Sequence, residues 1–405
     1  MFTRPLSVFL LCWLTGLASG SIATFVPLYL PNIVQSMVGT ADVAAVGHVG
    51  SFLQAAFLLG WVVGGIALGA VADRRGRTST LAASLALAIS CTLLLPSSDL
   101  PFLTYVLRFV TGVGVGSAMV ISTTLAAEVL SDARRPWLMG VLANSYAVGI
   151  IGMGIAQTKI AEWQTVAYGI SVFVVLVPLI LMAGKGSVAR TLDADTEPSI
   201  ARLVADLRSQ RRELIIGSTL FGCILICLWA AFSWLPSWAT ALHPGTDGGM
   251  GLRGRIMIAL GMGGIVGSLL SGPLAIRIAR VRTIVVCYGG AILASLPLYT
   301  TNVPSATMMT VSIAVLAVFF GMCQGLMALY IPELFAHHIR ATSVGICFNV
   351  GRILTAGAVL NIGVLVAAFG GYRKALLVFT LPLLVGLVVT RFAHEPKPLS
   401  TPVLT

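Results

Sequence analysis

Long apolar windows separated by short polar segments run along the whole chain. Each window is close to the length of about 20 residues that a helix needs to cross a hydrocarbon layer about 30 Å thick. The first window continues past Pro27 without a clear cleavage site, so it is predicted to be a membrane helix rather than a signal peptide. The pattern predicts twelve helices, near residues 6–30, 46–71, 79–96, 101–125, 137–158, 165–184, 214–238, 254–276, 283–300, 305–329, 342–366 and 373–391.

The composition supports a membrane protein. Of the 405 residues, 57% are hydrophobic and only 10% are charged, whereas roughly 25% are charged in an average soluble domain. One soluble core cannot bury so much apolar surface. The expected fold is therefore an all-α membrane protein of twelve transmembrane helices.

The basic residues fall mainly on one side of the predicted membrane. Eighteen of the 25 Lys and Arg lie at the chain ends or on one set of alternate connections, and five lie on the other set. Because Lys and Arg are enriched in cytoplasmic loops, both termini are predicted to be cytoplasmic, in a bacterial inner membrane. The net charge of +11 then reflects topology and contact with anionic membrane lipid, and no nucleic-acid partner is expected.

A long polar stretch divides six windows from six, and part of it has helical spacing of Ile200, Leu203, Val204 and Leu207. This spacing predicts a short amphipathic helix on the membrane surface. The predicted organisation is a six-helix bundle at 1–184, a cytoplasmic linker at 185–212, a second bundle at 213–391 and a short cytoplasmic tail at 392–405.

Polar landmarks recur in the two halves at one offset of 205 residues. The matched pairs are Glu128 with Glu333, Arg135 with Arg340, Gly116 with Gly321 and Asn144 with Asn349. Such a parallel repeat predicts two pseudo-symmetric bundles related by an axis along the membrane normal.

The loop at residues 69–77 combines glycine, aspartate and basic residues at a specific spacing. Its members are Gly69, Asp73, Arg74, Gly76 and Arg77. This spacing resembles the signature loop between helices 2 and 3 of the major facilitator superfamily, and the resemblance implies that the loop latches the two halves during rocking. The corresponding loop in the second half carries Ile276 near the aspartate position, so its latch is predicted to be degenerate.

Acid and base pairs are also expected at the ends of two helices. Glu128 precedes Arg134 and Arg135, and Glu333 precedes Arg340. We predict that these residues form gate pairs in the outward-facing state, although solvated surface charges have the same pattern.

The segments 108–128 and 330–353 resemble those of the metabolite and organic-acid proton symporters of this superfamily, including the aromatic-acid symporters. That resemblance implies a small organic solute as substrate, together with proton coupling. The stretch 16–21 departs from the aromatic-acid pattern because it carries no carboxylate. Facilitated diffusion, or a proton carried by the substrate, therefore remains open.

Two arginines, Arg108 and Arg352, lie deep inside predicted membrane helices, whereas all fourteen Asp and Glu lie in loops or at helix ends. An intramembrane arginine must be solvated or paired. In a water-filled cavity both would favour an organic anion, because the guanidinium presents a fork of donors that matches a carboxylate. The alternative is a neutral metabolite, transported in either direction, with both arginines structural.

The remaining candidates for substrate contact are polar or aromatic residues at membrane depth, and each is equally suited to holding helices together. They are Asn144, Tyr146, Trp229, Trp234, Gln324 and Asn349. The windows contain no nucleophile with a base, no metal cluster and no phosphate loop, so no enzymatic activity, cofactor or metal is expected. A monomer is predicted, and the seven cysteines are expected to pack in helices without disulfides.

Overall fold

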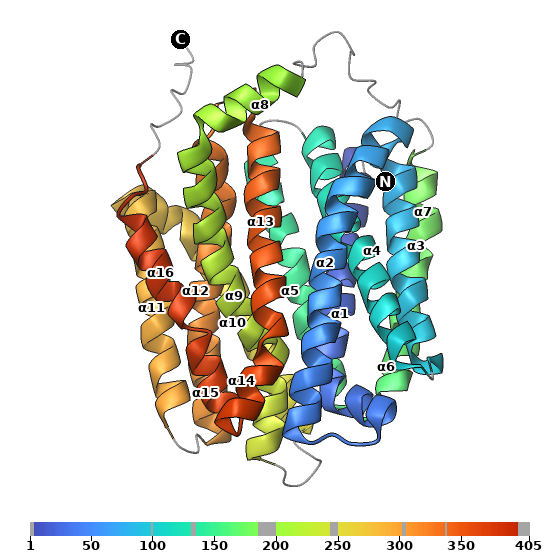
Figure 1. Ribbon diagram of the computed structural model, residues 1–405. Coiled ribbons are helices and arrows are strands. Elements are labelled where there is room, and N and C mark those ends of the chain that lie inside the picture. The colour runs from blue at the N-terminus through green and yellow to red at the C-terminus, as the bar shows by residue number, and fades with distance from the viewer. Residues whose placement is uncertain are drawn as a thin grey trace.

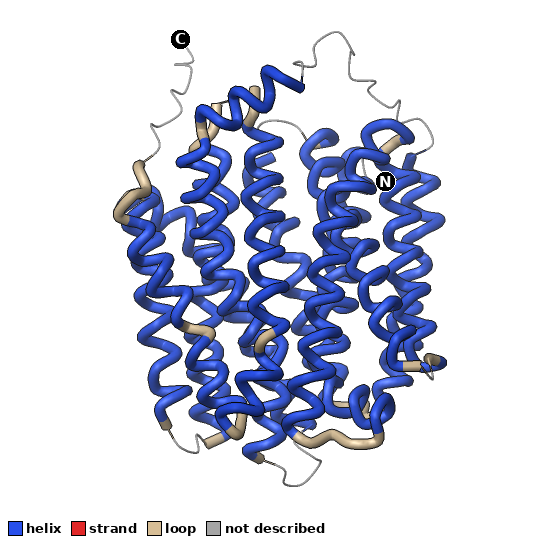
Figure 2. The backbone as a smooth tube through the Cα atoms, in the orientation of Figure 1, coloured by secondary structure: helices blue, strands red, loops and turns tan. Residues whose placement is uncertain are grey.

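The computed structural model describes residues 4–98, 100–130, 135–184, 200–243, 250–301, 305–336 and 338–395. In these ranges every regular element is a helix (Figure 2). The first half of the chain contains α1 (Arg4–Val38), α2 (Val43–Arg75), α3 (Arg77–Leu94), η1 (Leu95–Ser97), α4 (Pro101–Val129), α5 (Arg135–Gln157), α6 (Trp163–Gly169), η2 (Ile170–Val175) and α7 (Leu176–Gly184). After the short α8 (Ile200–Ser209), the second half contains α9 (Arg211–Leu242), α10 (Met250–Ile278), α11 (Arg280–Thr300), α12 (Ala306–Glu333), α13 (Arg340–Leu360), α14 (Ile362–Phe369), α15 (Tyr372–Val378) and α16 (Leu381–Thr390).

Within the described residues the helices form twelve segments that are long and apolar enough to cross a membrane. Eight of these are single helices, and the other four combine α3 with η1, α6 with η2 and α7, α13 with α14, and α15 with α16. The prediction of an all-α protein with twelve membrane-spanning segments is therefore confirmed.

Local capping fixes where several helices begin. Asp42 precedes α2, and its side chain accepts the Ala45 N–H at 2.7 Å. This hydrogen bond lowers the pKa of Asp42 below its ordinary value because it favours the carboxylate. Ser305 caps α12 in the same way, accepting the Met308 N–H at 3.2 Å. Both caps satisfy backbone donors that have no partner within the helix.

The helices gather into two bundles that lie side by side (Figure 1). Helices α1–α7 form the N half, in which α4 packs on α1, α2 and α3, while α9–α16 form the C half, in which α12 packs on α10 and α11. The start of α1, the end of α16 and helix α8 lie at one face, which we call the terminal face, and the other is the opposite face (Figure 1). The predicted pair of six-helix bundles is thus observed.

Glycines allow the same close helix contact in both halves. A Cβ on Gly64 of α2 would lie 2.0 Å from the Val113 oxygen of α4, and one on Gly267 of α10 would lie 1.9 Å from the Val318 oxygen of α12. The two glycines are 203 residues apart, and no larger residue fits at either backbone contact. Such close packing of small residues is a main source of helix association inside a bilayer.

The two halves touch near the opposite face. Gly154 of α5 lies against Gly254 of α10, where a Cβ on either residue would come within 2.7 Å of the other's carbonyl oxygen. Beside them, buried Arg253 of α10 donates to the Asn32 side chain of α1 at 2.9 Å and to the Leu28 carbonyl at 3.4 Å. These contacts seal the space between the halves on this side.

Substitution of Gly254 by Leu is expected to open this seal. Overpacking costs about 1–3 kcal/mol, which shifts a two-state equilibrium by roughly 5- to 150-fold. Spin labels at Ser36 of α1 and Arg255 of α10, both exposed, report the separation by double electron–electron resonance. We expect a longer distance population in Gly254→Leu but not in Gly251→Leu, because a Cβ on Gly251 meets nothing within 4 Å. Unchanged distances in both variants would show that the glycine contact does not hold the halves closed.

Candidate functional site

A cavity of about 340 Å³ lies between the two halves. Its wall is built by α2, α4 and α5 from the N half and by α9, α10, α12 and α13 from the C half. Five residues predicted from the sequence line it, namely Asn144, Tyr146, Trp229, Gln324 and Arg352. The cavity brings these polar and aromatic side chains from both halves together, so it is the candidate substrate site.

Arg352 of α13 reaches from the C half toward the N half. Its guanidinium carbon lies 5.4 Å from the ring centre of Trp61 on α2 and 5.8 Å from that of Phe221 on α9. Aromatic faces at these distances attract a cation without neutralising it. Across the described residues no carboxylate pairs with Arg352, which leaves its hydrogen-bond donors available to an anion.

Arg108 of α4 is placed differently from the prediction. Its side chain is 1% exposed, is not part of the cavity wall and lies 3.9 Å over the ring of Phe57. Its guanidinium donates to the carbonyl oxygens of Ala23 at 3.2 Å and of Ile22 at 3.5 Å, both on α1. The geometry therefore favours the structural alternative for Arg108.

The reason for this placement is found in α1. Pro27 lies inside the helix and has no N–H, so it leaves the carbonyl of the residue four positions earlier, Ala23, without its helical donor. A buried carbonyl without a partner destabilises the fold inside a membrane. Arg108 supplies the missing donor and ties α1 to α4.

Aromatic rings form a continuous wall across the two halves. The ring of Trp61 lies 6.1 Å from Tyr146 and 6.3 Å from Trp229, and Trp229 lies 5.2 Å from Phe232. Of the sequence candidates, Trp234 is fully buried away from the cavity lining and Asn349 is half-buried outside it.

Comparison with known proteins identifies the chain. A sequence model described as the Major Facilitator Superfamily matches residues 8–359. The chain belongs to this superfamily. It is therefore a multi-pass membrane transporter, as the signature loop at 69–77 indicated.

Two relatives in the superfamily match most of the chain. The cis,cis-muconate transport protein of Acinetobacter baylyi is 27% identical over 365 residues, which cover 85% of this chain and 83% of the relative. The 3-(3-hydroxy-phenyl)propionate transporter of Escherichia coli is 28% identical over 366 residues, which cover 87% and 86%. Among solved structures, the inward open xylose transporter XylE from E. coli superposes with a TM-score of 0.75 at 15% identity over 97% of both chains, which shows the shared fold.

The superfamily's signature loop forms ion pairs inside the N half. Arg77 pairs with Asp73 at 3.3 Å and with Glu128 of α4 at 2.9 Å. Gly76, with φ +101°, makes the turn between α2 and α3. Arg77 thus binds Glu128 in this structure. Arg134 and the Arg135 side chain, the predicted partners of Glu128 in the outward-facing state, lie outside the described residues.

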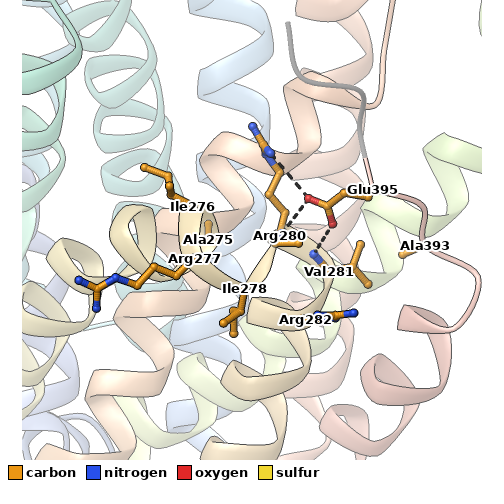
Figure 3. Close-up of a pocket in the computed structure, with 10 residues that line it drawn as sticks. Ala275, Ile276, Arg277, Ile278, Arg280, Val281, Arg282, Ala393 and Glu395 are labelled. Carbon is orange, nitrogen blue, oxygen red and sulfur yellow. Dashed lines mark hydrogen bonds and ion pairs between the residues drawn. The ribbon is translucent and has the colours of Figure 1, made fainter.

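The second copy of the loop has the same plan with different residues (Figure 3). Arg280, 203 positions after Arg77, pairs with Glu333 of α12. The pair of Glu333 with Arg340 in the outward-facing state stays a prediction. Ala279 makes the turn at φ +74°, where the first copy has Gly76. In both halves the loop thus brings its last arginine against the acidic residue near the end of α4 or α12.

Glu395 supplies a carboxylate to this second loop, where Ile276 stands at the aspartate position. Its oxygens accept the backbone N–H of Arg280 at 2.8 Å and of Val281 at 3.0 Å, and it lies 3.6 Å from the Arg280 guanidinium (Figure 3). Two open N–H groups at the start of α11 are thereby satisfied. The loop that appeared degenerate in sequence is completed by a residue 119 positions downstream of Ile276.

The Arg108 assignment predicts a rescue between distant residues. Arg108→Met is expected to lower stability by about 1–3 kcal/mol because it leaves the Ala23 carbonyl unpaired. Adding Pro27→Ala restores a donor to that carbonyl, so the double variant is expected to regain much of the loss in the apparent melting temperature in detergent. Pro31→Ala is the control, since its missing donor belongs to a different carbonyl. Equal effects of the two proline changes would contradict the assignment.

Replacing alanine by glycine is expected to have opposite effects on stability at two positions in and beside the second loop. Ala279→Gly is expected to stabilise the protein by about 1 kcal/mol, because glycine adopts positive φ without strain. Ala275→Gly, in the adjoining turn of α10, is expected to destabilise it by about the same amount. Glu395→Ala is expected to cost about 1 kcal/mol through loss of the cap. Thermal unfolding of the unmodified protein and the three variants measures the direction of each change in stability. Destabilisation by Ala279→Gly would show that the positive φ of Ala279 is not strained.

Proposed function

We propose that this protein is a secondary transporter that moves a small organic anion, a carboxylate, across the bacterial inner membrane by alternating access. Arg352 carries the proposal, because it is a cation at the wall of the cavity between the halves without a carboxylate partner in the described chain. Arginine binds carboxylates through paired donors. The names of the two relatives, a muconate transport protein and a hydroxyphenylpropionate transporter, support a carboxylate.

We further propose that the terminal face is cytoplasmic, in keeping with the positive-inside bias of the sequence. In that orientation the contacts of Gly154, Gly254 and Arg253 close the outer side, and the protein is inward-facing. The moving bodies are the bundles at 1–184 and 213–391, joined by the linker at 185–212 that includes α8. The protein acts as a monomer.

We propose that coupling of transport to protons does not use an acidic residue of the cavity wall. Among the described residues that line the cavity there is no Asp, Glu or His. The described wall therefore offers no ordinary carrier for a coupled proton, and facilitated diffusion of the anion is the alternative. Uptake into proteoliposomes with and without an inward proton gradient, at fixed membrane potential, separates coupled from uncoupled transport.

Substitution of Arg352 tests the function itself. Arg352→Gln is expected to lower kcat/KM for carboxylate uptake by roughly 100-fold or more, since the substrate loses its buried charge partner. Arg352→Lys keeps the charge but loses the paired geometry, so an intermediate loss is expected. Arg255→Gln, which removes an exposed arginine of α10, is the control for a change of net charge. Retention of uptake by both Arg352 variants would instead support a neutral metabolite as substrate.

A further inference from the structure

The charge on the cavity wall is a single cation. Arg352 is the one ionised side chain among the residues that line the cavity in the described chain. Arg108, the second deep arginine, is turned away and committed to the carbonyls of Ala23 and Ile22. The wall therefore offers one place, on the α13 side, where a negative charge is balanced.

The rest of the wall is suited to a ring and to neutral polar groups. Trp61 lies beside Arg352, and the ring of Trp229 lies next to that of Trp61 and nearly perpendicular to it, at 88°. Phe320 of α12 adds an aromatic surface. Asn144, Ser268 and Gln324 provide neutral hydrogen-bonding groups on α5, α10 and α12. The Asn144 amide already donates to the Gly140 carbonyl at 3.0 Å, which leaves its oxygen as an acceptor.

A second carboxylate on the substrate has no partner in this wall. An ionised carboxylate is costly to remove from water unless a cation or several donors replace the lost hydration. Water is excluded when the halves close around a substrate during alternating access. The free-energy cost of desolvating the second carboxylate therefore arises when the halves close. Transport of a dianion is then slowed more than its affinity for the open cavity indicates.

We propose that the cavity selects monoanions: it accepts aromatic monocarboxylates that bear neutral substituents and excludes dicarboxylates of the same size. This specificity rests on the proposed function, in which Arg352 binds the substrate carboxylate. It assigns to Gln324, Asn144 and Ser268 the binding of the uncharged end of the substrate. The determinant is the number of cations in the wall and not the volume of the cavity.

The test compares terephthalate with its monomethyl ester. The ester is slightly larger but carries one carboxylate, so size and charge make opposite predictions. In proteoliposomes at pH 7.5 and fixed membrane potential, we expect kcat/KM for the ester to exceed that for terephthalate by roughly 100-fold, as when a buried charge lacks a partner. Benzoate and phthalate form a second pair on a smaller frame, and cis,cis-muconate, a linear dicarboxylate, is expected to be excluded as well.

A complementary experiment adds a cation to the cavity wall so that the protein gains activity toward a dicarboxylate. Gln324→Arg places a second cation on the α12 side of the wall. It is expected to raise the ratio of kcat/KM for terephthalate to kcat/KM for its monoester by at least roughly tenfold. Gln324→Leu, the control of similar size without charge, removes the amide assigned to the uncharged end of the substrate. It is therefore expected to lower kcat/KM for the monoester without raising kcat/KM for terephthalate. Quenching of the cavity tryptophans Trp61 and Trp229 measures binding in each variant independently of transport.

The outcomes separate this inference from the function on which it rests. Equal transport of terephthalate and its monoester by the unmodified protein would overturn monoanion selection and leave the organic-anion function standing. Transport of dimethyl terephthalate, with neither acid transported, would overturn the organic-anion function itself. A preference for the monoester that Gln324→Leu reverses as fully as Gln324→Arg would show that charge is not the determinant.

Discussion

The requirement that every polar group inside the membrane find a partner shapes this protein around one interaction, the contact of Arg108 with the Ala23 carbonyl. Pro27 bends the hydrogen-bond ladder of α1 and frees that carbonyl. Arg108 fills the gap from α4 while its face rests on Phe57 of α2. Three helices of the N half are joined at this point, and one of two deep positive charges is removed from the central cavity. The charge of the cavity is consequently set by the C half alone.

The two halves show how a duplicated architecture keeps its geometry while its residues change. Glycines 203 positions apart hold the same helix pairs together, and Arg77 and Arg280 occupy the same place in the two loops. Around Arg280, however, an alanine replaces the turn glycine, and the tail residue Glu395 replaces the aspartate. The arginine at the loop end thus retains two carboxylates in each half, from different parts of the chain. The geometry of the ion cluster is maintained although the sequence motif is not.

Much of the fold could be predicted because the membrane imposes a simple rule on sequence. Apolar windows long enough to span a bilayer gave the twelve segments, and polar residues at membrane depth gave Asn144, Tyr146, Gln324 and Arg352 as cavity residues. Helical periodicity places a residue at a depth but does not fix the direction in which it points, so Arg108 and Trp234 were predicted at a cavity that they do not line. The contacts of Glu395 and Arg253 join segments that are far apart in the sequence. No local sequence pattern predicts such contacts.

The distribution of charged contacts also constrains what moves during transport. In the described parts of the chain, the ion pairs of Arg77 and Arg280 each stay within one half. Near the opposite face, close glycine contacts cross between the halves at Gly154 with Gly254 and at Gly47 with Gly363. The hydrogen bonds of Arg253 cross there as well. Rocking the halves apart at that face therefore leaves both charge clusters intact and disrupts mainly close backbone packing and one buried arginine. Small-residue contacts are short-ranged, and their energy is lost after a small displacement. The balance between the two states consequently depends on packing at a few glycines, whereas the charge clusters preserve the shape of each half as it moves.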